Sequence, residues 1–264
     1  MMTRQEIVEW LLDSDPSIRW QVMRDVCSSS ENEWQRERDR IGQEGWGKRI
    51  LDLQGNDGLW NGSLYNGKWI STSYSLYLLK LLGLAPGHER ALKGCRQLLT
   101  QGLHQGNEIR FSKKQDVSDW GVTALVLSIC SYFGEDSALL DPLVANLIRH
   151  QEITGNWLPY DAPSAEGYTF ETTLLVLEAL LQVQFRLTAP GRDLLAVVQK
   201  GHAFLLENRI GCPSGLPIKR QWLSFSYPNY WFYDLMSALD YFAAVRHPHD
   251  SFFEEAIDIL NSKR

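Results

Sequence analysis

The sequence predicts an all-α protein with the architecture of an α/α toroid, a closed barrel of about five to six pairs of inner and outer helices. Two observations predict this fold. Apolar segments with a helical pattern recur about every 50 residues and alternate with amphipathic ones. A Gln and a Trp with a Gly between them also recur in the connections. The whole chain, 1–264, is expected to form one domain.

The first kind of segment is apolar on nearly all sides. The segment 119–134, DWGVTALVLSICSYFG, aligns with 169–183, TFETTLLVLEALLQV, so that Thr123 corresponds to Thr173. The segment 68–83, KWISTSYSLYLLKLLG, aligns with 119–134 in turn. Shorter copies are IRWQVMRDV at 18–26 and LMSAL at 235–239. In 173–183 only Glu178 and Gln182 are strongly polar, which predicts a helix buried on most sides. The segments that align with it are predicted to be inner helices as well.

The second kind of segment has one polar face. It covers LAPGHERALKGCRQLLTQGL at 84–103, SALLDPLVANLIRHQE at 137–152 and APGRDLLAVVQKGHAFLLENR at 189–209. Helix pairs bury a continuous core when one layer is apolar on both sides and the other layer is polar on its outer side. The alternation therefore predicts either an open solenoid of helix pairs or the same pairs closed into a barrel.

A short motif marks the turn from an outer to an inner helix. Residues 53–62 read LQGNDGLWNG, and residues 150–159 read HQEITGNWLP. The paired residues are Gln54 with Trp60, and Gln151 with Trp157. The stretch LLTQGLHQGNEIRF at 98–111 is a degenerate copy that keeps the Gln and a Gly but lacks the Trp.

This L-x-x-Q-x-x-x-G-x-W pattern resembles the QW motif of squalene and oxidosqualene cyclases and of the related protein prenyltransferase β subunits. As a repeat pattern the resemblance covers most of the chain. It implies a closed α/α toroid in which the motif ties outer to inner helices, with the Gln capping a neighbouring helix end and stacking on the Trp. It also implies a central cavity for an elongated apolar ligand of the isoprenoid type.

The catalytic acid of the cyclases is only partly matched. That acid belongs to a D-x-D-D motif at the N-terminal end of an inner helix, commonly followed by Thr-Ala. The same register here reads DWGVTA at 119–124, which keeps Asp119 but has Gly and Val in place of the acidic pair. In the next repeat Glu171 takes the place of the central Asp. Asp119, Glu171 and, in a later segment, Asp234 are the candidate acids, although a carboxylate in the first turn of a helix also suits the free N–H groups there.

The zinc site of the prenyltransferases is not matched. It combines an Asp-x-Cys sequence with a His. Cys130 follows Ser128 and Cys212 follows Ile210 at that spacing, and Asp25-Val26-Cys27, which does have this sequence, is not accompanied by a His at metal-ligand spacing. The 4 cysteines are scattered singly and no His stands at metal-ligand spacing, so neither a disulfide framework nor a metal is expected. We expect buried free thiols, no metal and no cofactor.

The segment 224–242, SFSYPNYWFYDLMSALDYF, is the richest in aromatic residues, and it is expected to be an inner helix with its approach. The helix at 17–26 is expected to lie beside it where the ring closes. The candidate ligand-binding residues are Trp20, Arg24, Trp120, Phe170, Tyr230, Trp231 and Tyr233. Aromatic rings at such a position can stabilise carbocations or line an isoprenoid tunnel, or they can simply fill the core where the first and last repeats meet.

Three functions follow from these observations. The first is a toroid similar to terpenoid cyclases and prenyltransferases that binds an apolar small molecule, with catalysis unproven. The second is a carbohydrate-active α/α-barrel hydrolase or lyase, whose pair of carboxylates would come from Asp119, Asp161, Glu166 and Glu171. The third is a non-catalytic helical-repeat scaffold. The Gln-Trp motif favours the first over the second, and the missing acidic pair and zinc ligands leave the third open.

Composition narrows the partners and the location. The chain has 26 basic and 32 acidic residues, a net charge of -6, and no basic cluster, so nucleic acid is not an expected partner. The N-terminus carries charge throughout and does not read as a signal peptide. The most apolar stretch, SLYLLKLLGLA, contains Lys80 and is far shorter than the roughly 20 residues that span a bilayer. We expect a cytoplasmic protein without a transmembrane segment, and the oligomeric state is left open.

Overall fold

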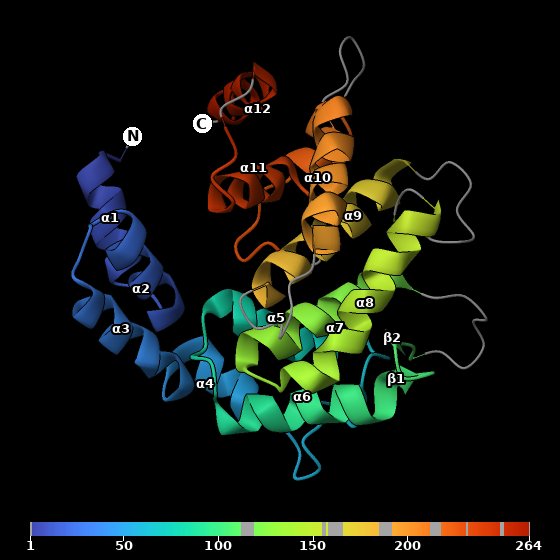
Figure 1. The fold of residues 1–264 in the computed structure, drawn as a ribbon. Helices are drawn as coiled ribbons and strands as arrows, with labels where there is room; N and C mark the ends of the chain where they lie inside the picture. The colour runs from blue at the N-terminus through green and yellow to red at the C-terminus, as the bar shows by residue number, and fades with distance from the viewer. Residues whose placement is uncertain are drawn as a thin grey trace. The chain divides into compact units, whose positions relative to one another are not determined.

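The fold was analysed in a computed structural model, which describes residues 2–111, 119–154, 157, 166–184, 192–211, 218–230, 232–248 and 251–263. The described elements are helices apart from one two-stranded hairpin, which confirms the all-α prediction (Figure 1). By packing, the chain divides into two compact units, Met1–Gly102 with Tyr132–Glu135, and Leu103–Ser131 with Asp136–Arg264. The closed toroid and the single domain over 1–264 stay predictions.

The first unit begins with short capped helices. Its elements are α1 (Arg4–Leu12), α2 (Pro16–Asp25), α3 (Glu31–Asp39), the 3-10 helix η1 (Arg40–Gly42), α4 (Gly45–Asp52), α5 (Thr72–Leu82) and α6 (Glu89–Gly102). Asp15 caps α2 by accepting a hydrogen bond from the N–H of Ser17, and Pro16 occupies the first helical position, where its missing N–H costs nothing. The prediction of a helix at 18–26 is thereby confirmed to within a few residues.

The predicted inner helix at 68–83 begins later than expected, at Thr72. The backbone N–H groups of Thr72 and Ser73 donate to the carbonyls of Ser63 and Leu64, both at 2.9 Å, so the helix start is tied to the preceding connection. The first six residues of α5 are all buried, as an inner helix requires.

The second unit contains the remaining helices and the hairpin. Its elements are β1 (Leu103–His104), β2 (Glu108–Ile109), α7 (Trp120–Phe133) as far as Ser131, α8 (Ser137–Thr154), α9 (Glu166–Val183), α10 (Arg192–Glu207), the 3-10 helices η2 (Arg209–Gly211) and η3 (Arg220–Leu223), α11 (Leu235–Ala244) and α12 (Ser251–Asn261). The strands are antiparallel and pair Leu103 with Ile109 and His104 with Glu108.

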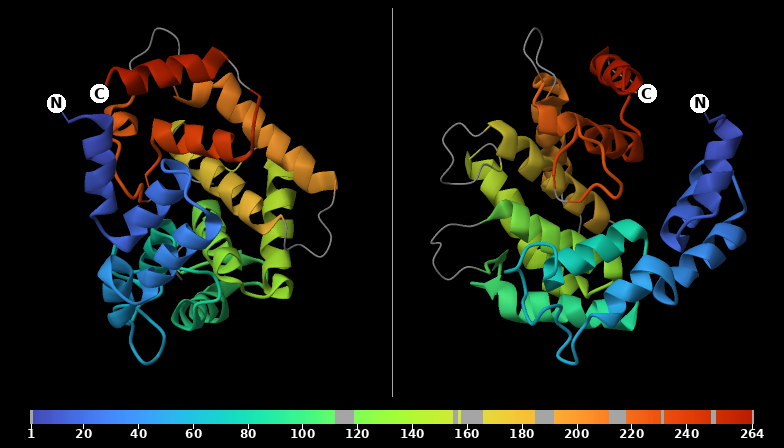
Figure 2. Two further views of the ribbon diagram at one scale, coloured as in Figure 1. Left: turned by 90° about the vertical axis from the view of Figure 1, so that its left-hand side faces the viewer. Right: turned by 180° about the vertical axis from the view of Figure 1, so that it is seen from behind.

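Inner and outer helices differ in burial as the sequence predicted. Every residue of α7 from Trp120 to Ser131 is buried, whereas α10 alternates buried and exposed positions. Helices α8 and α9 both contact α10, and α9 also contacts α11, so these helices lie side by side (Figures 1 and 2). The segment 224–242 is a helix preceded by a non-helical approach, as expected, with α11 beginning at Leu235.

The first Gln-Trp motif ties two helices together. The indole N–H of Trp60 donates to the carbonyl of Ile50 in α4 at 2.6 Å. The side-chain amide of Gln54 donates to the carbonyl of Arg90, in the first turn of α6, at 2.8 Å. The motif therefore joins the end of one outer helix to the next outer helix.

The second motif makes the same connections in the second unit. The indole N–H of Trp157 donates to the carbonyl of Leu147 at 3.0 Å, and both Trp residues thus reach back ten residues along the chain. The amide of Gln151 donates to the carbonyl of Val197 in α10, also at 3.0 Å. Val197 lies well inside its helix, so the Gln binds the neighbouring helix without capping its end, which differs from what the resemblance implies.

The degenerate copy lacks the side-chain bonds of the Gln and the Trp, but it keeps a hydrogen bond from a backbone N–H to a Thr hydroxyl at the start of the next inner helix. The N–H of Ile109 donates to the hydroxyl of Thr123 at 3.1 Å, as the N–H of Trp60 does to the hydroxyl of Thr72 at 3.0 Å. Gln101 is exposed and bonds within its own helix. Thus Ile109, on the β1–β2 hairpin, takes the place of the missing Trp.

A glycine accompanies each complete motif on the neighbouring outer helix. Gly94 lies four residues after Arg90, and Gly201 lies four residues after Val197. A Cβ on Gly94 would come within 2.9 Å of the Trp60 ring, and one on Gly201 within 2.8 Å of Leu177. The outer helices therefore approach these buried side chains closely because both positions lack a side chain.

Candidate functional site

Three of the predicted site residues come together in the second unit. Glu171 is half-buried near the N-terminal end of α9, and the backbone N–H of Tyr233 donates a hydrogen bond to its carboxylate. Phe170 packs its ring against those of Tyr233 and Trp222, with centroids 5.7 and 5.3 Å apart. The sequence analysis missed Trp222, whose ring also has the ammonium of Lys219 above it at 4.8 Å.

The electrostatics of Glu171 follow from these surroundings. Burial raises the pKa of its carboxyl group. The hydrogen bond from Tyr233 and the positive charge of Lys219 act in the opposite direction but only partly offset this effect. The pKa of Glu171 therefore lies above the usual range for a glutamate.

The other two candidate acids cap helices. The carboxylate of Asp119, which is exposed, accepts a hydrogen bond from the N–H of Val122 at 3.0 Å. The buried carboxylate of Asp234 accepts from both the N–H and the hydroxyl of Ser237, at 2.8 and 2.6 Å. These bonds satisfy N–H groups in the first turns of α7 and α11, which is a sufficient structural reason for both residues.

Trp20 and Arg24 belong to the packing of the first unit. The indole N–H of Trp20 donates to the carbonyl of Leu82 at 3.0 Å. The guanidinium groups of Arg24 and Arg38 lie 4.5 and 5.1 Å from the centroid of the same ring, an arrangement that favours cation–π attraction. Arg24 also pairs with Asp25 at 2.6 Å. The expected contact between this helix and 224–242 stays a prediction.

The remaining candidates are dispersed. Trp120 is buried and stacks on His150, with ring centroids 4.0 Å apart. Tyr230 is half-buried in the approach to α11. Trp231, Asp161 and Cys212 lie outside the described residues, as does the side chain of Glu166. Of the cysteines, Cys95 and Cys130 are buried free thiols as predicted, whereas the prediction is wrong for Cys27, which is exposed.

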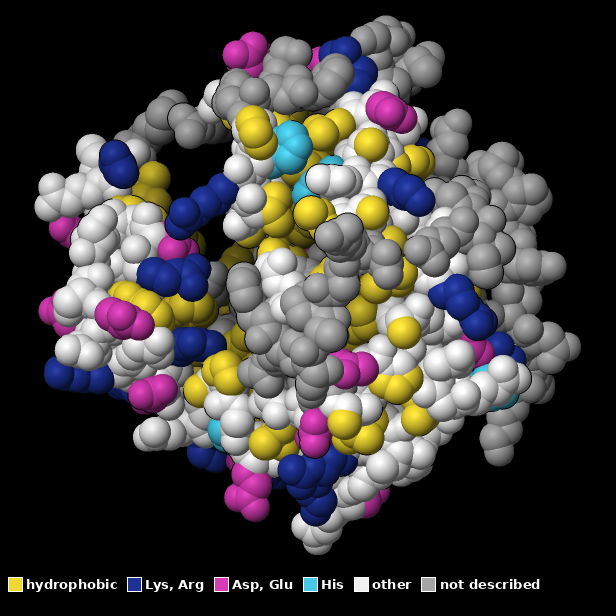
Figure 3. Space-filling model, in the orientation of Figure 1, with side chains coloured by type: hydrophobic (Ala, Val, Ile, Leu, Met, Phe, Trp, Pro, Cys, Tyr) yellow, Lys and Arg dark blue, Asp and Glu magenta, His cyan; other side chains and the backbone are white. Residues whose placement is uncertain are grey.

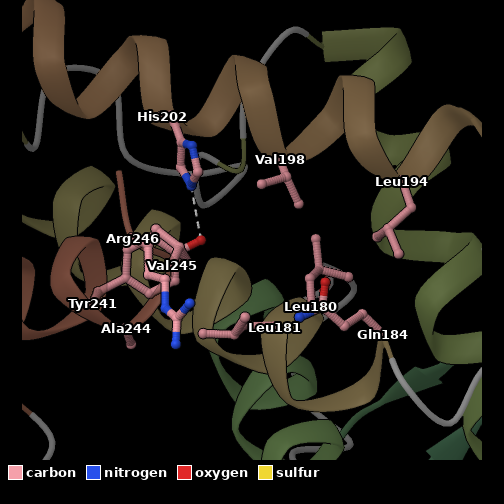
Figure 4. Close-up of a pocket in the computed structure, with 10 residues that line it drawn as sticks. All are labelled: Leu180, Leu181, Gln184, Leu194, Val198, His202, Tyr241, Ala244, Val245 and Arg246. Carbon is pink, nitrogen blue, oxygen red and sulfur yellow. Dashed lines mark hydrogen bonds between the residues drawn. The ribbon is translucent and has the colours of Figure 1, made fainter. Parts of the chain in front are cut away.

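An apolar pocket that the sequence analysis did not predict lies between α9, α10 and α11. Its volume is about 360 Å³. Its lining residues are Leu180, Leu181, Gln184, Leu194, Val198, His202, Tyr241, Ala244, Val245 and Arg246 (Figure 4). In Figure 3, histidine side chains lie among hydrophobic ones on the face over α10 and α11.

One wall of the pocket carries a polar pair. The Nε2 atom of His202 and the hydroxyl of Tyr241 share a hydrogen bond of 2.9 Å (Figure 4). Burial, with a smaller contribution from nearby His247, lowers the pKa of His202 to about 4. Burial and the charge of Glu178 raise the pKa of Tyr241. Both side chains are therefore neutral at neutral pH, and the mostly aliphatic lining carries this uncharged pair together with the amide of Gln184 and the guanidinium of Arg246.

The helical periodicity of the sequence indicates one wall of this pocket. Leu194, Val198 and His202 recur at intervals of four residues and so lie on one face of α10. A histidine on the apolar face of an amphipathic helix marks a polar group turned toward the interior. The partners of that face on α9 and α11 are distant in sequence, and no periodicity identifies them.

Comparison with known proteins finds no similar protein. No family model matches the sequence, and no curated protein or solved structure matches it. Among the described residues, no helix is both long and apolar enough to cross a membrane, and no group of His, Cys, Asp and Glu is arranged to hold a metal ion.

Proposed function

We propose that this chain binds a small, largely apolar ligand of the isoprenoid type in the pocket between α9, α10 and α11. The observation that carries the proposal is the combination of aliphatic walls with the neutral His202–Tyr241 pair. Pockets for small molecules typically have volumes of roughly 300 to 1,000 Å³, are mostly apolar and hold a few polar groups that orient the ligand. The volume of about 360 Å³ falls at the small end of this range.

The polar pair selects the ligand's head group. A neutral imidazole and a neutral phenol exchange hydrogen bonds with hydroxyl or carbonyl groups and supply no charge themselves. Arg246, which also lines the pocket, is a further hydrogen-bond donor. An isoprenoid alcohol has the matching chemistry, because its chain suits Leu180, Leu194 and Val198 while its hydroxyl suits the pair. The arrangement of Gln54 and Trp60, repeated at Gln151 and Trp157, supports kinship with the cyclase and prenyltransferase toroids, which act on isoprenoids.

Binding is better supported than alkene protonation. A cyclase acid must be strong, and neighbouring carboxyl groups activate it. The raised pKa of Glu171 makes it a weaker acid than an ordinary glutamate, and its described neighbours are Lys219 and the N–H of Tyr233. We therefore assign Glu171 no proton transfer to an alkene.

The test is a titration of the full chain with farnesol, followed by isothermal calorimetry. We expect saturable binding to the wild-type protein. Val198→Trp should abolish this binding, because the larger ring fills the pocket. Leu195→Trp is the matched control, since Leu195 is on the same helix but is 63% exposed, and it should bind farnesol like the wild type.

Thermal unfolding monitored by circular dichroism shows whether each variant is folded. His202→Phe keeps an aromatic ring but removes the hydrogen-bonding nitrogen, so it should weaken farnesol more than a hydrocarbon of the same chain length. The proposal fails if wild-type protein shows no saturable binding, or if folded Val198→Trp binds as well as Leu195→Trp. Either result would favour the helical-repeat scaffold.

A further inference from the structure

A second pocket of different chemistry lies in the same unit, between the β1–β2 hairpin, the start of α7 and α8. Its volume is about 600 Å³, and most of the side chains around it are polar. The hairpin contributes Glu108 and Arg110, α7 contributes Trp120, and α8 contributes Asn146 and Arg149, three residues apart on one helical face.

The floor of this pocket is a buried ion pair. The guanidinium of Arg110 lies 2.5 Å from the carboxylate of Glu108, and the two side chains are only 18% and 7% exposed. The hairpin that carries them is fixed to α7 because the N–H of Ile109, between them in sequence, donates to the hydroxyl of Thr123. A buried pair held by the backbone in this way has its donors and acceptors in a defined orientation.

The pocket also has an excess of positive charge. Glu108 and Arg110 neutralise each other, and the exposed Arg149 adds a further cation. Within the described part of the chain, no carboxylate lies at ion-pair distance from Arg149. Asn146, on the same face of α8, supplies an amide that both donates and accepts hydrogen bonds.

The wall formed by Trp120 is held in place by His150. The two rings are stacked with an interplanar angle of 28°, and burial lowers the pKa of His150. The imidazole is therefore uncharged at neutral pH and serves as a packing surface. The indole is consequently a fixed flat wall beside the amide and guanidinium groups.

From these groups we infer that this pocket binds a polyhydroxylated anion of monosaccharide size, such as a sugar phosphate. Arg149 binds the acidic group, because a guanidinium matches the oxygens of a phosphate or carboxylate in a bidentate geometry. Asn146 and the Glu108–Arg110 pair bind hydroxyl groups, which need donors and acceptors together. The site is separate from the apolar pocket, and the inference does not depend on the function proposed for that pocket.

The experiment is isothermal calorimetry of the full chain with glucose 6-phosphate, glucose and inorganic phosphate. We expect glucose 6-phosphate to bind more tightly than either of the other two. Arg149→Gln should weaken glucose 6-phosphate roughly tenfold or more, because a charge-assisted hydrogen bond is lost. Lys200→Gln is the matched control, since it removes the same charge from an exposed position on α10 and should leave binding unchanged.

Arg149→Lys keeps the charge but not the planar fork, and its affinity should fall between those of wild type and Arg149→Gln. Circular dichroism confirms that each variant is folded. Inorganic phosphate that binds as tightly as glucose 6-phosphate would overturn the inference, because the hydroxyl contacts would then contribute nothing. Absence of binding, glucose bound as tightly as its phosphate, or equal losses in Arg149→Gln and Lys200→Gln would overturn it as well.

Discussion

His202 and Tyr241 share a hydrogen bond that joins α10 to α11 across 39 residues of sequence. Nε2 either accepts from the hydroxyl or, when it carries a proton, donates to it, and burial favours the neutral imidazole. The cost of protonating this histidine connects the apolar pocket to the pH dependence of folding.

Acid should destabilise the protein partly through His202. Its pKa is about 4 in the folded state, against a value near 6.5 for an exposed histidine. The unfolded chain therefore binds more protons between these two values, and the free energy of unfolding should fall as the pH drops from about 6.5 toward 4. Urea unfolding at several pH values measures this slope.

The reference for that experiment is His202→Phe, which cannot be protonated. Burial also lowers the pKa values of His88 and His150, but both remain in the variant and cancel in the comparison. The variant should lose less stability than the wild type over the same pH range. Equal slopes would show that His202 titrates normally.

Removing the indole N–H of Trp60 or Trp157 should destabilise the fold. Trp60 and Trp157 are each 1% exposed, and Phe at either position leaves a carbonyl, that of Ile50 or Leu147, without its hydrogen bond. Together with the lost ring volume, we expect a decrease of about 2 kcal/mol in the free energy of unfolding for each variant. Trp10→Phe, at a position 65% exposed, should change it by less than about 0.5 kcal/mol in the same urea experiment.

Two helical glycines should respond to alanine with opposite signs. Gly94→Ala places a Cβ within 2.9 Å of the buried Trp60 ring, so we expect a loss of roughly 1 to 3 kcal/mol. At Gly121 the nearest atom would be 3.4 Å away, an ordinary contact, and the higher helix propensity of alanine should stabilise the protein by up to about 1 kcal/mol. Thermal melting distinguishes the two, and a stabilising Gly94→Ala would mean that the indole is not packed there.

Glu171→Gln should stabilise the protein at neutral pH. The raised pKa means that ionising this carboxyl costs more in the folded state than in the unfolded one, so its contribution to stability is lost as the pH rises through its folded pKa. The Gln side chain is uncharged and can still accept the N–H of Tyr233. The gain over wild type, measured by urea unfolding at pH 7, should shrink at pH 4, where the wild-type carboxyl is largely protonated. A variant less stable than the wild type at pH 7 would show that the attraction to Lys219 outweighs the cost of burial.

The sequence predicted the helices and their repeat well because both depend on local patterns. The apolar run from Trp120 to Ser131 predicted a helix buried all round, and Thr72 and Thr123, aligned by the repeat, make equivalent hydrogen bonds. The predicted helix with its approach at 224–242 also ends within two residues of the end of α11. The boundary between approach and helix was not predicted, because aromatic residues suit both helices and extended segments, and the N-cap at Asp234 was read as a catalytic acid.

The candidate site was predicted only in part. Phe170, Glu171 and Tyr233 do meet, because repeat alignment located the N-terminal end of α9 and composition located the aromatic segment. The apolar pocket was missed because it requires the C-terminal turns of α9, one face of α10 and the end of α11 at once. Pairing of that kind depends on three-dimensional packing, and a single sequence contains no direct signal for it.

The hydrogen bonds that Trp60 makes to Ile50 and Thr72 affect which insertions the chain can accept. The connection from α4 to α5 is anchored near its beginning by Ile50 and at its far end by Thr72, whose hydroxyl accepts the N–H of Trp60 and donates to the carbonyl of Ser63. The residues 66–70 between these anchors are exposed and belong to no helix or strand, although the ring of Trp69 packs against that of Tyr74 in α5. Since the entropy of closing a loop grows only slowly with its length, new segments can be spliced into this connection while the helices stay in register. The connections between helix pairs are thus positions where insertions can add new surface while the helices keep their packing.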